Sequence, residues 1–253
     1  MIQLKNAQEL AKMRRACQIS AEALKLGGRS IEAGMTTADL DKIIYDYIKR
    51  HGARPNFKGL YGFPGTACIS INDEVIHGLP SHSRQIRPGD IVSIDTGAAI
   101  NGFNGDNACT FPCGKVDIEA QRLMDVTKES LHRGIAAAVA GNRVGDIGHA
   151  VQSYVEENGF SVVRSFVGHG VGKELHEDPE VPNYGHAGHG VRLVNGMTIA
   201  IEPMVNQKHH SVKALSDGWT VVTADGGLAA HFEHSIAILP GGPEILTIGW
   251  EEP

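Results

Sequence analysis

Four acidic residues and one histidine have the types and the spacing of a metal site. Asp95 ends an apolar stretch, and Asp106 follows it eleven residues later, which is the length of a β-hairpin. Glu202 ends a second apolar stretch, and Glu233 lies 31 residues after it in a further predicted strand. His169 stands between two glycines, which let a backbone come close to a ligand. An acidic residue at the end of a buried strand is unfavourable unless it is paired or binds a cation.

The chemistry that such a set supports is metal-assisted hydrolysis. Four carboxylates and one imidazole form a mostly hard, oxygen-rich set of ligands, which suits manganese, iron, cobalt or zinc. Two divalent ions about 3.5–4 Å apart can share a hydroxide nucleophile and stabilise the charge that forms during its attack. Each acid alone would be an ordinary surface or salt-bridged carboxylate. It is their related positions that predict a site with two divalent metal ions.

The related positions come from an internal repeat. Residues 33–52 match residues 140–159 at an offset of 107, with five identities and several matched apolar positions. The same offset places Asp95 on Glu202. Two related halves, each helix–helix–strand, can pack about a pseudo-twofold axis so that equivalent carboxylates face one another. A cation between two facing carboxylates removes their repulsion.

Hydrophobic periodicity predicts the elements that must position these residues. The predicted helices cover residues 6–26, 117–139 and 145–157, and a further helix starts near Thr37 and is stopped by Gly52. The predicted strands cover residues 67–72, 90–96, 108–111, 161–167, 197–202, 219–223 and 232–239. The pair Gly27-Gly28 is expected to end the first helix, and residues 102–105 are expected to form the turn before Asp106.

This order of elements indicates an α/β (α+β) protein in which both halves contribute to one unit. We expect a single catalytic domain over residues 1–253, with repeat halves of about 1–115 and 116–253. No low-complexity or proline-rich linker separates the halves.

Composition and charge argue against several other classes of protein. The formal net charge of −6 disfavours nucleic acid as the main ligand. The charged first residues do not form the core of a signal peptide, and the apolar runs are far shorter than the roughly 20 residues that span a bilayer. The four cysteines lack the spacing of a zinc or redox motif, which indicates free thiols in a reducing cytosol. We expect a cytoplasmic protein that contacts no membrane.

Five segments, in this order along the chain, resemble the type I methionine aminopeptidases. They are CISINDEVIHGLP (68–80), DIVSIDTGAAINGFNGD (90–106), FVGHGVGKELHEDPEVPNY (166–184), IAIEPM (199–204) and HFEHSIAIL (231–239). The likeness extends from about residue 5 to residue 248. It implies the pita-bread fold, a pseudo-symmetric structure with a strongly curved, mainly antiparallel sheet. It also implies removal of the initiator methionine from nascent proteins and peptides that have a small second residue.

The resemblance implies a role for each candidate ligand. The metal ligands would be Asp95, Asp106, His169, Glu202 and Glu233. Asp106 and Glu233 would bridge both ions, Asp95 would bind one ion, and His169 and Glu202 would bind the other. Glu202 would also handle the proton of the bridging water. The metals expected are cobalt, manganese, iron or zinc.

Two further histidines match catalytic histidines of the family. His77 would contact the substrate near its amine and its scissile amide. His176 would hydrogen-bond the scissile carbonyl and stabilise the oxyanion. From the residues alone, His176 follows His169 by seven positions across a glycine-rich turn, so both could face one cavity.

The substrate pocket departs from the family's pattern while staying apolar. The residues expected to bind the methionine side chain are Phe63, Cys68, Leu175 and Trp219. Phe63 stands where tyrosine is frequent, and Leu60 and Leu175 stand where aromatic residues are common. Phe57 stands where a cysteine is common. An apolar pocket of this kind accepts a flexible, polarizable thioether.

Three alternatives differ from this interpretation in ways that the sequence can address. An Xaa-Pro peptidase of the same fold usually has a further N-terminal domain, whereas 94 residues precede Asp95 here. A type II methionine aminopeptidase has a helical insertion, whereas only 25 residues separate His176 from Glu202. A binding protein that had lost the metals would lack ligands, and this chain has all five. We expect nascent chains as substrates, a transient ribosome contact and a monomeric protein.

Overall fold

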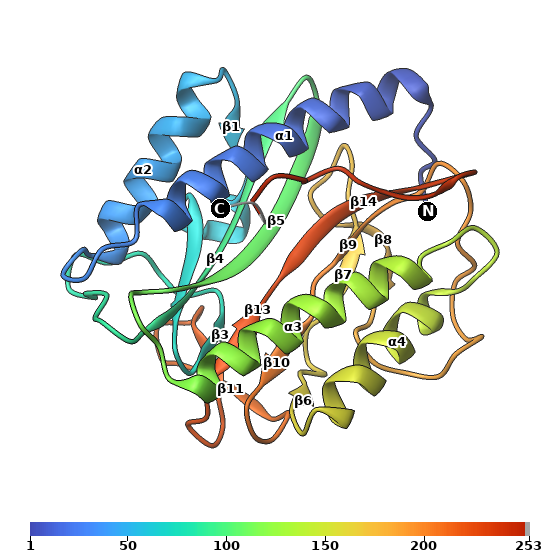
Figure 1. The fold of residues 1–253 in the computed structure, drawn as a ribbon. Helices are drawn as coiled ribbons and strands as arrows, with labels where there is room; N and C mark the ends of the chain where they lie inside the picture. Colours follow the sequence, from blue (N-terminus) through green and yellow to red (C-terminus); the bar gives the residue numbers. More distant parts are fainter. Residues whose placement is uncertain (251–253) are drawn as a thin grey trace.

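The computed structural model describes residues 1–250, which contain four α-helices arranged in two pairs around a curved sheet (Figure 1). The helices are α1 (Ala7–Arg29), α2 (Thr37–Arg50), α3 (Ile118–Ala137) and α4 (Val144–Glu157). A capping box starts α1, in which Asn6 accepts from the Glu9 N–H at 3.0 Å and Glu9 accepts from the Asn6 N–H at 3.1 Å. Thr36 and Asp39 form the same two-way cap at α2, whereas at α4 only Asp146 contributes, accepting from the Arg143 N–H at 2.7 Å.

The main sheet has nine strands, and all its pairings are antiparallel. Its strands are β1 (Arg54–Pro55), β2 (Ala67–Ile71), β4 (Ile91–Ile100), β5 (Phe103–Pro112), β7 (Gly168–Gly170), β8 (Glu177–Val181), β9 (Thr198–Ile201), β14 (Glu233–Leu239) and β15 (Gly242–Ile245). Their order is β1-β4-β5-β14-β9-β7-β8, with β2 on β4 and β15 on β14. The sheet therefore runs through both halves of the sequence and joins them between β5 and β14.

Two small antiparallel sheets complete the fold. One has the order β13-β10-β6 and the other has the order β11-β12-β3. Their strands are β3 (Glu74–Ile76), β6 (Ser161–Val162), β10 (Met204–Asn206), β11 (Val212–Ala214), β12 (Val221–Thr223) and β13 (Ala229–His231). Helices α1 and α2 lie over the strands of the first half, and α3 and α4 lie over those of the second half (Figure 1).

The two halves share backbone features at the offset of 107 that the sequence shows. Helix α2 shifted by 107 residues coincides with α4 at both ends. An isolated bridge joins Thr36 to Gln85, and a second bridge joins Arg143 to Arg192, again 107 residues later. These features agree with the predicted duplicated arrangement of helices and strands.

The first helix continues past the residues that were expected to end it. Gly27 and Gly28 are helical, and α1 ends at Arg29 with Ser30 as its C-cap. A Cβ at Gly28 would lie 2.3 Å from the ring of Phe111, and a Cβ at Gly27 would lie 3.0 Å from Ile44. The prediction was wrong because these glycines let α1 approach β5 and α2 closely.

The hairpin that carries Asp106 also turns earlier than predicted. Ile100 pairs with Phe103, so the loop consists of Asn101 and Gly102, with φ of 55° and 77°. Positive φ at both positions suits a two-residue hairpin turn. Gly105 lies inside β5, where a Cβ would be 2.5 Å from the backbone of Cys17 in α1.

The strand predicted for residues 161–167 is short in the structure. Only β6, Ser161–Val162, forms within it, and β7 begins at Gly168. Strand β6 pairs with β10 in a small sheet, whereas β7 pairs with β8 and β9 in the main sheet. The chain must therefore bend between them. The other predicted strands are confirmed within a few residues, apart from β5, which begins earlier.

Of the helices in residues 1–250, none has the length and apolar character that a bilayer-spanning segment needs. The four cysteines are free thiols, and all are buried. This agrees with the predicted absence of structural disulfides.

Candidate active site

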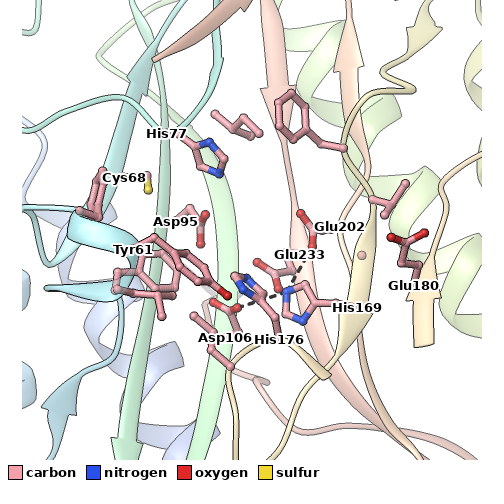
Figure 2. A pocket seen from close by; sticks show the side chains of 18 of the residues that line it. Tyr61, Cys68, His77, Asp95, Asp106, His169, His176, Glu180, Glu202 and Glu233 are labelled. Carbon is pink, nitrogen blue, oxygen red and sulfur yellow. Dashed lines mark ion pairs between the residues drawn. The ribbon is translucent and has the colours of Figure 1, made fainter. Parts of the chain in front are cut away.

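All eleven residues that the sequence analysis assigned to the site line one cavity of about 530 Å³. Figure 2 shows this cavity from close by. The metal candidates in its lining are Asp95, Asp106, His169, Glu202 and Glu233, and the others are Phe63, Cys68, His77, Leu175, His176 and Trp219. Residues from both halves of the chain therefore meet in one place.

The register of the main sheet brings three of the carboxylates together. Asp95 on β4 and Glu233 on β14 both pair with Ala108 on β5. Directly opposed residues of an antiparallel sheet point to the same face, so these side chains share one face with only a methyl group between them. Asp106 lies two residues from Ala108 on the same strand and therefore faces the same side.

Glu202 and His169 reach this point from the second half of the chain. Glu202 directly follows β9, which lies beside β14 in the sheet. His169 on β7 has Nε2 3.6 Å from Asp106 Oδ2 and 3.5 Å from Glu202 Oε1. Ligand atoms of Asp106, His169 and Glu233 lie within 4.8 Å of one another. Figure 2 shows these side chains converging, with His176 beside His169.

The environment of His169 makes it a neutral imidazole with a fixed orientation. Its Nδ1 lies 2.8 Å from the carbonyl oxygen of Gly170, so Nδ1–H donates and the lone pair of Nε2 faces the carboxylates. Burial, with a smaller contribution from His176, lowers the pKa of His169 to about 4. The ring is therefore unprotonated at neutral pH.

The glycines on either side of His169 allow close packing of neighbouring strands. A Cβ at Gly168 would lie 2.3 Å from the carbonyl oxygen of Ala200, and a Cβ at Gly170 would lie 2.2 Å from that of Asp178. They let β7 pack between its neighbouring strands. The close approach that these glycines permit is to protein backbone.

The carboxylates are buried close together, and a bound cation would offset the electrostatic cost of that burial. Burial is the largest cause that raises the pKa of each, and mutual repulsion raises that of Asp95, Glu202 and Glu233 further. The pKa of Asp106 rises to about 7, also because of burial. One oxygen each of Asp95, Asp106 and Glu233 is buried without a hydrogen-bond partner. Unpaired, mutually repelling carboxylate oxygens beside a neutral imidazole fit a site for divalent cations.

Two more histidines stand at the entrance to this cluster. His176 lies edge-on to His169, with ring centroids 4.5 Å apart, and burial lowers its pKa. His77 packs edge-on against Phe166 at 5.7 Å, and burial followed by the charge of His176 lowers its pKa. Both rings are therefore neutral near pH 7, and each can donate one N–H.

An apolar pocket adjoins the carboxylates through the sheet. Cys68 on β2 pairs with Asp95 on β4, which places the thiol next to the cluster. Phe63 meets Trp219 edge-to-face with centroids 5.1 Å apart. The buried members of the pocket are Phe57, Phe63, Cys68 and Leu175, with Leu60, Leu79 and Trp219 partly buried against them. Burial raises the pKa of Cys68 well above its usual value, so it stays a thiol.

Two site residues were missed by the sequence analysis. Tyr61 lines the cavity with its side chain mostly exposed, has a φ of 50°, and lies parallel to the ring of His176 at 6.1 Å. His231 is buried, with Nε2 3.7 Å from Glu202 Oε2, and burial lowers its pKa to about 3. The position of His231 two residues before Glu233 was the available signal, because alternate residues of an extended chain share a face.

Comparison with known proteins agrees with this site. Residues 11–240 match metallopeptidase family M24. The chain is 55% identical over 248 residues to the methionine aminopeptidase of Clostridium perfringens, covering 98% of this chain and 99% of that protein. It is 50% identical over 247 residues to methionine aminopeptidase 1 of Bacillus subtilis, with coverage of 98% and 99%.

The fold agrees as well. The crystal structure of methionine aminopeptidase from Thermotoga maritima superposes with a TM-score of 0.96 at 45% identity, over 98% of this chain and 99% of that one. A prolidase from Pyrococcus furiosus superposes with a TM-score of 0.79 at 23% identity and shares the fold, and this chain covers 65% of it. The predicted pita-bread fold is confirmed. The chain belongs to the methionine aminopeptidases of metallopeptidase family M24.

Proposed function

We propose that this chain hydrolyses the bond after an N-terminal methionine in peptides and nascent proteins, and that it prefers a small second residue. One observation carries the proposal: a cluster of buried, partly unpaired carboxylates adjoins an apolar pocket within one cavity of about 530 Å³. The cluster fits the hydrolytic chemistry, and the pocket fits an unbranched thioether.

We propose two divalent cations, manganese, iron, cobalt or zinc, held by Asp95, Asp106, His169, Glu202 and Glu233. Asp106 lies between the other candidates, because its Oδ2 is 3.6 Å from His169 Nε2 and its side chain shares a sheet face with that of Asp95. When bound, the cations would supply a water nucleophile of lowered pKa and would offset negative charge near the scissile carbonyl.

The side chains around the cluster provide the proton transfer and the substrate geometry. Glu202 faces the cavity and would take the proton of the attacking water and deliver it to the departing amine. His176, neutral and next to His169, would donate its N–H to the carbonyl oxygen as negative charge develops there. His77 would contact the scissile amide from the other side.

Substrate choice would depend on the pocket and on the rim of the cavity. The methionine side chain would enter between Phe63, Cys68, Leu175 and Trp219. The second residue would then pass the histidines and Tyr61, whose ring lies parallel to that of His176 at 6.1 Å. A long second side chain would displace these rings, whereas glycine, alanine or serine would fit.

Three further proposals concern the context of the enzyme. We propose a single catalytic domain over residues 1–253 with halves of about 1–115 and 116–253, which the matched bridges and helices at an offset of 107 support. We propose a cytoplasmic monomer, because its substrates emerge there as nascent chains. Transient contact with the ribosome would bring it to them.

A peptide panel tests the proposed function. Peptides that start Met-Ala, Met-Gly, Met-Lys, norleucine-Ala, Leu-Ala and Ala-Pro are incubated with the manganese-loaded enzyme, and released amino acids are quantified by mass spectrometry. Methionine should leave Met-Ala and Met-Gly fastest, with norleucine starts slower by the roughly 10–200-fold that one pocket contact provides. Glu202→Gln serves as the matched inactive control. Preferential cleavage before proline, whatever the first residue, would favour the peptidases of the prolidase group that share this fold.

A further inference from the structure

An ion pair connects the N-terminal arm, residues 1–6, to the loop that carries His176. Lys5 Nζ donates to Glu177 Oε2 at 2.5 Å, and the two side chains are only 4% and 7% exposed. Glu177 is the residue directly after His176 in the chain. The N–H of Lys5 donates to the carbonyl oxygen of Gly196 at 2.7 Å, which fixes the arm beside the main sheet.

The ion pair also determines the shape of the loop. Glu177 Oε1 accepts from the N–H of Glu174 at 3.2 Å, so one carboxylate holds both the arm and the turn. A Cβ at Gly172 would lie 2.5 Å from Lys5 Cε and 2.6 Å from Glu177 Oε1. The pair therefore packs directly against the backbone of the turn, and only glycine leaves room for it there.

Other contacts hold the loop as well, among them the backbone pairing of Glu177 on β8 with Gly170 on β7. Asn104 Nδ2 donates to the carbonyl oxygens of Gly172 at 3.0 Å and Lys173 at 2.9 Å, at the start of the turn. Lys173 pairs with Glu9 at 3.4 Å with its own side chain largely exposed. Exposed pairs contribute little because water and salt screen them. The pair of Lys5 with Glu177 is buried and adjoins His176 in the chain.

His176 depends on its backbone for its direction. Its ring meets His169 edge-on at 4.5 Å and lies parallel to Tyr61 at 6.1 Å. Both are contacts between rings, which permit the ring to shift without breaking a directional bond. A displacement of about 1 Å in a catalytic group can cost roughly 10²-fold in rate.

We propose that Lys5 is a positioning residue for the reaction. Through Glu177 it fixes the backbone that aims the His176 N–H at the scissile carbonyl. The proposal rests on the role proposed for His176. Lys5 itself touches neither the substrate nor the metal ligands, so its loss should change the rate of the chemical step far more than the binding of substrate or metal.

Four variants of the full chain test this, with the wild type: Lys5→Met, Glu177→Gln, the double variant Lys5→Met/Glu177→Gln, and Lys12→Met as the matched control. Lys12 is an exposed lysine of α1. Steady-state kcat and KM are measured on a Met-Ala peptide. Hydrogen exchange of residues 172–178 is followed by mass spectrometry on the same samples.

Loss of the ion pair between Lys5 and Glu177 should lower kcat by about 10–100-fold, while KM should stay within about threefold of the wild type. The three arm and loop variants should share this kcat, because each removes the same interaction and the losses do not add. Exchange should accelerate at residues 172–178 and stay unchanged in the control. Manganese affinity, measured by calorimetry, should stay within about threefold in all four variants.

Two results would overturn the proposal: a kcat of Lys5→Met within about twofold of the wild type, or losses that multiply in the double variant. If Lys5→Met fails to fold because it leaves Glu177 buried and unpaired, the double variant decides, since it buries no unpaired charge. An inactive wild type would contradict the proposed function instead. The exchange of residues 172–178 requires no turnover and would still test the positioning.

Discussion

Asp95 and Glu233 share a single partner, Ala108, on the strand that lies between them. The three residues form one row across β4, β5 and β14, with their side chains on the same face. Because alanine contributes only a methyl group, the carboxylates on its two sides can converge on the cavity. The smallness of Ala108 is thus a requirement of the cluster.

Enlarging this residue should weaken metal binding. Ala108→Val adds two methyl groups to the middle of the row and should push the flanking carboxylates apart, so that affinity for manganese falls by about 10–100-fold. Titration calorimetry on chelated protein measures this. Cys109→Val is the matched control, since the next residue of β5 faces the opposite side of the sheet. Unchanged affinity in Ala108→Val would show that the row does not hold the ions.

The stability of the metal-free protein should fall as pH rises. Burial raises the pKa of Asp106 to about 7, so the folded state retains a proton that the unfolded chain gives up near its ordinary value of 3.8. The resulting stabilisation is complete below about pH 4 and is lost as pH rises through about 7. The raised pKa values of Asp95, Glu202 and Glu233 act in the same direction, and together they outweigh the opposite effect of the buried histidines with lowered pKa. Chelated protein should therefore melt at a lower temperature at about pH 8 than at about pH 6.

The carboxylate variant gives the control for this pH dependence. Asp106→Asn removes the titrating group and should reduce the difference in melting temperature between the two pH values. Saturating manganese should stabilise the wild type most at the higher pH, where the carboxylates are charged. A chelated protein that grows more stable from about pH 6 to about pH 8 would contradict the burial argument.

Removing the imidazole of His176 should affect the transition state more than the ground state. His176→Ala should lower kcat by about 10²–10³-fold, because its N–H strengthens its hydrogen bond as the oxyanion forms. KM should stay within about threefold of the wild type. His176→Gln, which keeps a donor, should recover part of the rate. His186→Ala, an exposed histidine outside the cavity, is the matched control, and an unchanged kcat in His176→Ala would exclude the assigned role.

The sequence predicts the elements of the fold better than the contacts between them. Asp95 and Glu202 could be placed at strand ends because each follows an apolar, strand-forming stretch, and the offset of 107 relates them. The shared partner of Asp95 and Glu233 could not be predicted, since it depends on how β5 and β14, far apart in the chain, align their registers. Local patterns do not contain that information.

Contacts between residues far apart in the chain also explain where the predictions from the sequence fail. Gly27 and Gly28 carry the local signal of a helix end, and the packing of α1 on Ile44 and Phe111 overrides that signal. Tyr61 could not be recognised from the sequence, because what marks it is its orientation over His176, a residue 115 positions away. Acidic residues at related positions are easier to find than a side chain whose significance lies in what it contacts.

The proposed function requires two divalent ions at one cluster for the release of N-terminal methionine. The most direct test is to chelate the purified protein exhaustively, confirm metal loss by mass spectrometry, and then titrate manganese while following binding and cleavage of a Met-Ala peptide. We predict no activity without metal, up to two ions bound per chain, and recovery of activity as they bind. Full activity in protein verified as metal-free would contradict the account.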